Sequence, residues 1–253
     1  MQLGLVTYNL AKDWDLPTLI SRCEETGFAA VELRTTHAHG VEPGMSEEAK
    51  QQAQELFGST GVQLWCLGTT CEFHSADPEI VRQNIETCNE FALLAHDLGA
   101  IGVKVRPNGL PEGIPERKTL EQIAAALQEC GENAMGYGVN IFLEVHGRQT
   151  SDPRRIKRIM DQVEASNVQV CWNSNSSDKD DLGGIHLAFE LLADRIGSVH
   201  INELWREDYP WRELFRLLYQ HDYQGYTLAE IPASSDPVRL MRYYQRLWQE
   251  LSH

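Results

Sequence analysis

The stretch VNIFLEVHG at residues 139–147 combines an almost continuous apolar run with two polar side chains near its end, Glu144 and His146. Its β-branched and aromatic residues favour a strand, and apolar residues at consecutive positions indicate burial on both faces, as in a parallel sheet. The preceding segment, residues 118–138, has helical periodicity and ends in Gly. A Gly just past a helix suits the left-handed C-cap that leads into a strand. The two segments therefore predict one helix–strand unit of a parallel sheet.

The same unit recurs along the whole chain. Seven further short apolar runs cover residues 3–9, 29–34, 62–68, 101–107, 168–174, 196–203 and 226–232. Other amphipathic segments include residues 17–27, 46–61, 78–100 and 237–253. Asp-Pro steps at Asp77, Asp152 and Asp236 predict a helix N-cap followed by Pro in the first turn. Eight alternating units predict a single (β/α)8 TIM-barrel domain over residues 1–253, in the α/β class.

Composition excludes several classes of function. The formal net charge is −15 at pH 7, which weighs against nucleic acid as a partner because binding to phosphates relies on Lys and Arg. No stretch approaches the ~18 apolar residues that span a bilayer, so no membrane partner is expected. The first ten residues lack the basic region and cleavage site of a signal peptide, which predicts a cytoplasmic location. No G-x-G-x-x-G follows the first strand, so a dinucleotide cofactor is not expected.

The six cysteines show no C-x-x-C pair and no zinc-type spacing. In a cytoplasmic chain they are expected to be free thiols that pack in the core. Cys71, which lies in an expected active-site loop, is assigned to packing for the same reason.

Polar side chains gather at the ends of the predicted strands, where the chemistry of such barrels is located. Glu144, Asn173, His200 and Glu230 come from four successive strands. Inward-pointing carboxylates are costly unless they are paired or bound to a cation. These four residues therefore indicate either a divalent metal site or a buried polar network without metal, and the pattern alone does not separate the two. Oxygen ligands suit Mn²⁺ or Mg²⁺, and the imidazole also suits Zn²⁺ or Co²⁺.

Other strand-end side chains are expected to hold a small polyhydroxylated substrate through its hydroxyl or phosphate oxygens. They are Glu32, His74, Lys104, Arg106 and His146. For His146, a ring that is packed and hydrogen-bonded within the barrel is an equally good interpretation.

Three motifs give the chain a resemblance to the sugar phosphate isomerase/epimerase family of xylose isomerase-like TIM barrels. They are LEVHG with Glu144, VHINE with His200 and LAEIP with Glu230. The resemblance implies that these residues bind a divalent metal and that Glu144 and Glu230 also carry protons in catalysis. The run HINELWR is similar to ketose 3-epimerases, in which an Arg after the metal-binding His contacts the substrate, and this implies a substrate-binding role for Arg206. At strand six the sequence departs from the family, because Asn173 stands where an Asp ligand is usual.

The resemblance favours a metal-dependent isomerase or epimerase that removes a proton next to a carbonyl of a sugar, sugar phosphate or keto-polyol. A dehydratase acting on a keto-inositol or dehydroshikimate-like substrate would begin with the same step and stays an alternative. The loss of a carboxylate at Asn173 also leaves open a binding protein without catalysis. A phosphodiesterase on abasic DNA is disfavoured, because its multi-zinc cluster would have to be built from His37, His39 and His74 in an acidic chain. The sequence leaves open whether the chain forms a homo-oligomer.

Overall fold

Eight parallel strands close into a barrel in the computed structural model, which describes residues 1–252. Each strand pairs with its neighbour in sequence, and β1 pairs with β8 to complete the closure. The strands are β1 (Gln2–Val6), β2 (Ala30–Arg34), β3 (Gln63–Glu72), β4 (Gly102–Arg106), β5 (Asn140–Glu144), β6 (Val168–Asn173), β7 (Ile196–Ile201) and β8 (Tyr226–Ala229). The predicted TIM barrel is confirmed.

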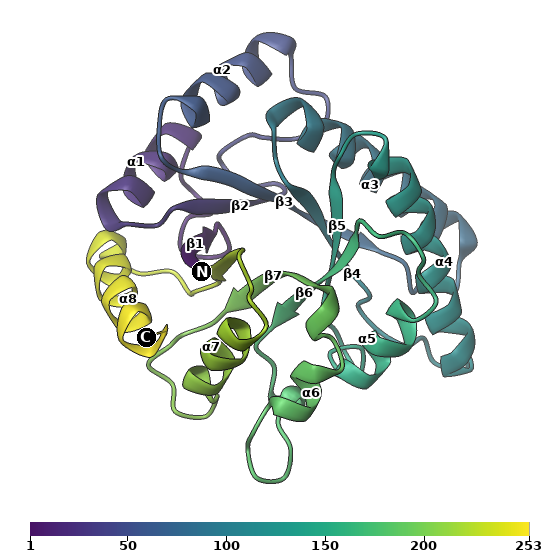
Figure 1. The fold of residues 1–253 in the computed structure, drawn as a ribbon. Helices are drawn as coiled ribbons and strands as arrows, with labels where there is room; N and C mark the ends of the chain where they lie inside the picture. Colours follow the sequence, from purple (N-terminus) through teal and green to yellow (C-terminus); the bar gives the residue numbers. More distant parts are fainter. Residues whose placement is uncertain (253) are drawn as a thin grey trace.

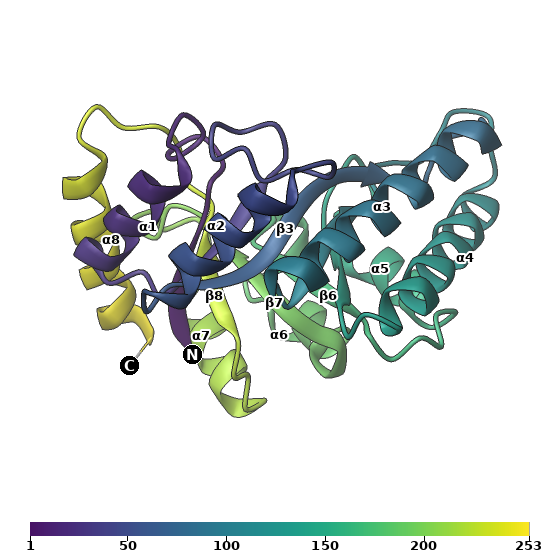
Figure 2. The same cartoon turned by 90° about the horizontal axis from the view of Figure 1, so that it is seen from above.

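The helices follow one another around the outside of the barrel (Figure 1). Figure 2, turned by 90°, shows α1 to α4 lying outside the strands. The helices are α1 (Leu16–Thr26), α2 (Glu47–Gly58), α3 (Pro78–Leu98), α4 (Glu116–Met135), α5 (Pro153–Met160), α6 (His186–Glu190), α7 (Trp211–Gln220) and α8 (Pro237–Ser252). The predicted last helix included His253, which lies outside the described residues.

The predicted helix caps are present. The Asp77 and Asp152 carboxylates accept hydrogen bonds from backbone N–H groups two residues further on, and Asp236 accepts one from the Arg239 N–H. These side chains satisfy helix N–H groups that have no partner within the helix. Gly27 and Gly99 adopt left-handed C-caps with φ of 78° and 72°.

The position of the candidate site follows from the two-residue period of the strands. Apolar side chains fill the barrel interior on the N-terminal side of the candidate site. One cluster contains Ala30 and Leu228, and another contains Phe142 and Cys171. Side chains two residues apart on a strand point to the same face. The side chains two residues further along these strands, towards the C-terminal ends, therefore also point inward. These side chains are polar, and they are Glu32, Glu144, Asn173 and Glu230.

Two predicted elements differ in detail. The third strand was expected to end at residue 68, but β3 continues to Glu72, and Cys71 is buried in this extension. The connection between β6 and β7 contains only the five-residue helix α6, flanked by 3-10 turns at Ser176–Asp178 and Ala193–Arg195. All six cysteines are free and buried, as predicted. Within residues 1–252, no helix combines the length and the apolar character needed to cross a membrane.

Candidate active site

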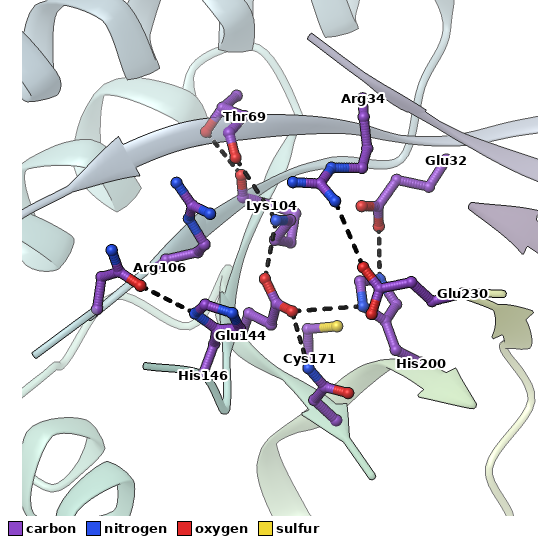
Figure 3. A network of polar contacts seen from close by, with 12 residues as sticks. Glu32, Arg34, Thr69, Lys104, Arg106, Glu144, His146, Cys171, His200 and Glu230 are labelled. Carbon is purple, nitrogen blue, oxygen red and sulfur yellow. Dashed lines mark hydrogen bonds and ion pairs between the residues drawn. The ribbon is translucent and has the colours of Figure 1, made fainter. Parts of the chain in front are cut away.

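Three predicted metal ligands converge at the C-terminal end of the barrel. Glu144 ends β5, His200 lies in β7, and Glu230 directly follows β8 (Figure 3). The backbone N–H of Glu230 donates to the Ile201 carbonyl at 2.9 Å, so the strand pairing continues through this residue and directs its side chain. One ligand atom from each of the three side chains lies within 4.8 Å of the others.

Glu144 is held by two nitrogen donors. Lys104 Nζ lies 2.8 Å from Glu144 Oε2, and the Asn173 amide Nδ2 donates to Glu144 Oε1 at 2.9 Å. The Lys104 and Glu144 side chains are each 3% exposed. Burial alone would raise the pKa of Glu144, but the Lys104 ammonium and His200 outweigh it and hold this pKa well below the ordinary value. Glu144 is therefore a carboxylate at neutral pH.

A hydrogen bond to Glu32 orients the His200 ring. The His200 Nε2–H donates to Glu32 Oε2 at 2.9 Å, and both side chains are fully buried. Gly68 leaves the space for this carboxylate, because a Cβ at that position would lie 2.6 Å from Glu32 Oε1. The other ring nitrogen, His200 Nδ1, is buried without a hydrogen-bond partner and lies 3.6 Å from Glu144 Oε1.

Glu230 has a different environment. Its Oε1 lies 3.5 Å from an Arg34 guanidinium nitrogen, and the Arg34 guanidinium also stacks on the Tyr8 ring at 5.3 Å. Burial is the largest influence on Glu230 and raises its pKa above the ordinary value, although His200 opposes the shift. The environments of Glu144 and Glu230 thus move the pKa values of two adjacent carboxyl groups in opposite directions, an arrangement typical of paired acid and base groups.

The donor set of these residues fits a divalent cation. A carboxylate that hydrogen-bonds one ring nitrogen of a metal-binding His is a common orienting contact, and it leaves the other nitrogen free to ligate. His200 Nδ1 has no hydrogen-bond partner within residues 1–252, and oxygens of Glu144 and Glu230 lie close to it. One nitrogen and two carboxylates suit Mn²⁺, Zn²⁺ or Co²⁺ as well as Mg²⁺. Asn173 directs its amide nitrogen at Glu144, so its role as a fourth ligand stays a prediction.

Two predicted substrate ligands, Glu32 and Lys104, are buried in the barrel. Glu32 is 0% exposed beneath His200, and Lys104 is buried against Glu144. Glu32 hydrogen-bonds His200 and Lys104 contacts Glu144, and the predicted contacts of Glu32 and Lys104 with a substrate stay predictions. The sequence indicated that both point inward but not how far down the barrel they lie.

The other predicted substrate ligands lie at the rim. Arg106 donates to Glu72 Oε1 at 2.6 Å, while its buried Nε has no partner. His146 Nδ1 is hydrogen-bonded to Asn108 Oδ1 at 2.9 Å. Burial lowers the pKa of His146, and nearby Arg106 adds to this shift, so the ring is neutral at pH 7. Within residues 1–252, His74 Nδ1 is buried without a hydrogen-bond partner and lies 3.9 Å from Glu72 Oε2.

Arg206 and Glu230 line one cavity of about 320 Å³. The Arg206 side chain is 52% exposed and forms an ion pair with Asp208, and its predicted contact with a substrate stays a prediction. Other lining residues are Tyr8, Ser174, Lys179, Asn202 and Tyr209.

One wall of this cavity depends on a buried carboxyl group that sequence reasoning missed. Asp178 Oδ2 accepts hydrogen bonds from the Tyr209 hydroxyl and the Asn175 N–H, both at 2.8 Å. The same Tyr209 hydroxyl accepts a bond from Trp172 Nε1 at 3.2 Å. Burial raises the pKa of Asp178 to about 7. A single Asp in a polar loop gives no sequence signal of burial.

Arg34 was also missed as a site residue, although its spacing of two from Glu32 places both on the same face of β2. By contrast, His37 and His39, two of the three histidines considered for a multi-zinc cluster, form hydrogen bonds within the fold. Thr7 hydrogen-bonds His37, and both ring nitrogens of His39 contact backbone groups. Among residues 1–252, Glu144, His200 and Glu230 form the one group of three His, Cys, Asp or Glu side chains placed to hold a metal ion together.

The chain belongs to the family described as the xylose isomerase-like TIM barrel, whose sequence profile matches residues 20–251. No curated protein sequence matches it. Among solved structures, D-psicose 3-epimerase from Clostridium cellulolyticum H10 superposes with a TM-score of 0.83 at 17% identity, covering 100% of this chain and 98% of that one. The 3-keto-D-glucoside 4-epimerase YcjR from E. coli gives 0.80 at 15% identity, covering 99% and 98%. The zinc-containing IOLI protein gives 0.78 at 17% identity, covering 100% and 96%. At these identities the likeness concerns the fold.

Proposed function

We propose that the protein is a metal-assisted sugar epimerase or isomerase acting on a keto sugar or a related keto-polyol. The observation that carries this proposal is the pairing of Glu144 and Glu230 around His200, within 4.8 Å and with pKa values displaced in opposite directions. Similar structures that are sugar epimerases, including one described with D-tagatose, support the same class of reaction. Another similar structure is described with a bound zinc atom, which supports metal binding by a barrel of this kind.

The two carboxyl groups can divide the proton transfers between them. Glu144 is ionised at neutral pH, as a group that accepts a proton from carbon must be. Glu230 has a raised pKa and can return a proton to the intermediate. A divalent cation bound at the three residues would stabilise negative charge on the substrate oxygens. Two proton carriers suit epimerisation, in which a proton leaves one face of a carbon and returns on the other.

Free donors near Glu230 and Glu144 favour an oxygen-rich substrate. Within residues 1–252, the Arg34 guanidinium has an ion pair at 3.5 Å and a stacking contact but no hydrogen bond. Arg106 has an unfilled Nε, and Nδ1 of His146 is occupied, which leaves its Nε2 for a ligand. The cavity of about 320 Å³ lined by Glu230 and Arg206 has a volume at the lower end of the range for small-molecule sites. We assign Arg34, Arg106, His146 and Arg206 to holding hydroxyl or phosphate oxygens.

The proposal is tested by incubating the Mn²⁺-loaded protein with a panel of ketohexoses, ketopentoses and their phosphates, and by separating the products chromatographically. We expect interconversion of epimers, and at least a 100-fold loss of rate in Glu144→Gln and in Glu230→Gln, since an amide cannot exchange a proton with carbon. The exposed Glu207 of the same face supplies the control Glu207→Gln, which should retain the wild-type rate. Wild-type rates in both site variants would contradict the proposal, and an ultraviolet-absorbing enone product would instead identify a dehydratase.

A further inference from the structure

Glu144 has both carboxylate oxygens engaged before any cation binds. Lys104 Nζ contacts Oε2 at 2.8 Å and the Asn173 amide contacts Oε1 at 2.9 Å. Figure 3 shows the Lys104 ammonium reaching Glu144 from the side of the barrel that faces Thr69. Of the three proposed ligands, Glu144 has the closer cationic partner, because Lys104 Nζ lies 2.8 Å from its carboxylate whereas Arg34 lies 3.5 Å from that of Glu230.

Lys104 has little freedom to leave this position. It comes from β4 in the barrel interior, and its side chain is 3% exposed. Its only other acceptor within residues 1–252 is the Thr69 carbonyl at 3.5 Å. Removing an ammonium from its carboxylate inside a protein leaves two uncompensated buried charges, which is strongly unfavourable. A divalent cation that binds Glu144 must therefore share this carboxylate with a fixed positive charge.

We propose that Lys104 is a built-in counter-cation that keeps the ligand cluster assembled without metal and weakens its affinity for divalent cations. This inference rests on the metal-binding part of the proposed function and makes Lys104 a positioning residue. Repulsion between an ammonium and a dication that share one carboxylate is large at low dielectric. Asn173 also weakens the affinity for divalent cations, because its amide donates to Glu144 and adds no negative charge to the cluster.

The test replaces Lys104 by neutral residues and measures metal affinity, which requires no substrate. Calorimetric titration with Mn²⁺ should show at least tenfold tighter binding in Lys104→Met and in Lys104→Gln than in the wild type. In EDTA, both variants should melt several degrees below the wild type, because Glu144 is left buried without a cation. Saturating Mn²⁺ should remove most of that difference.

A matched control is Lys50→Met, which removes a lysine that pairs with Asp97 at 2.8 Å on the outer surface. It should leave the Mn²⁺ affinity unchanged.

Folded Lys104 variants with wild-type Mn²⁺ affinity would overturn the role of Lys104 while leaving the proposed function standing. Failure of both variants to fold even with excess Mn²⁺ would also overturn it, because the dication should replace the missing charge. Absence of Mn²⁺, Zn²⁺, Co²⁺ and Mg²⁺ binding in every form would refute the metal-binding part of the proposed function together with this inference. Loss of turnover in Glu144→Gln alone bears on the function and not on Lys104.

Discussion

Replacing Asn173 by Asp should have opposite effects on the metal-free and metal-loaded protein. In the metal-free protein the change removes the amide donor 2.9 Å from Glu144 Oε1 and places a second carboxylate there. A buried hydrogen bond to a charged group is worth about 1.5–3 kcal/mol, and like-charge repulsion adds to the loss, so we expect a cost of roughly 3 kcal/mol. For a chain of this size that corresponds to a fall in Tm of about 6–12 °C.

In the metal-loaded protein the new carboxylate can become a ligand. We expect Asn173→Asp to bind Mn²⁺ about tenfold more tightly than the wild type, which corresponds to ~1.4 kcal/mol. Differential scanning fluorimetry in EDTA and in saturating Mn²⁺ measures the stabilities, and calorimetry measures the affinity. The control is Asn167→Asp, which loses two amide bonds of 2.9 Å outside the ligand cluster and should not be rescued by metal. An unchanged Tm in EDTA together with unchanged or weaker Mn²⁺ binding would refute the placement of Asn173 in the ligand cluster.

Two further predictions concern buried carboxyl groups. The pKa of Asp178 is raised from 3.8 to about 7 by burial, so the folded state favours its protonated form. Its contribution to stability is complete below pH 3.8 and is lost as pH rises towards 7, by about 4 kcal/mol in all. Urea unfolding at pH 4 and pH 7 should show this loss of unfolding free energy in the wild type but not in Asp178→Asn. The same pH dependence of the unfolding free energy in both proteins would contradict the prediction. Glu32→Gln should weaken Mn²⁺ binding about 10- to 100-fold because the orienting bond to His200 Nε2 is weakened; equal calorimetric affinities would show that Glu32 does not position the ligand.

The sequence was sufficient for the barrel because its local signals agree with one another. Apolar runs alternate with amphipathic segments. Helix N-caps such as Asp152, followed by Pro153, and C-caps such as Gly99 mark the helix ends that the same βα repeat requires. The predicted length of β3 was wrong, because its extension through Cys71 to Glu72 contains polar residues that are typical of a loop sequence. The expected single-domain extent and cytoplasmic location stay predictions, and the sequence left the oligomeric state open.

The inward direction of the site residues was also predictable, whereas their depth and partners were not. A strand period of two places Lys104 and Glu144 on inner faces, but which carboxylate an ammonium reaches depends on side-chain length and strand stagger. The burial of Glu32 likewise depends on Gly68 in the adjacent strand. The Arg206–Asp208 ion pair is set by the conformation of the loop after β7, which no periodicity encodes.

We propose that Glu144 and Glu230 exchange a proton with a carbon next to a carbonyl. The most direct measurement is proton NMR of candidate keto sugars incubated with the Mn²⁺-loaded protein in D₂O, followed by removal of the metal. We predict that deuterium enters the carbon next to the carbonyl of the true substrate at the rate at which its epimer forms, and that Glu144→Gln and Glu230→Gln abolish this exchange. Epimer formation without deuterium at that carbon would contradict the account.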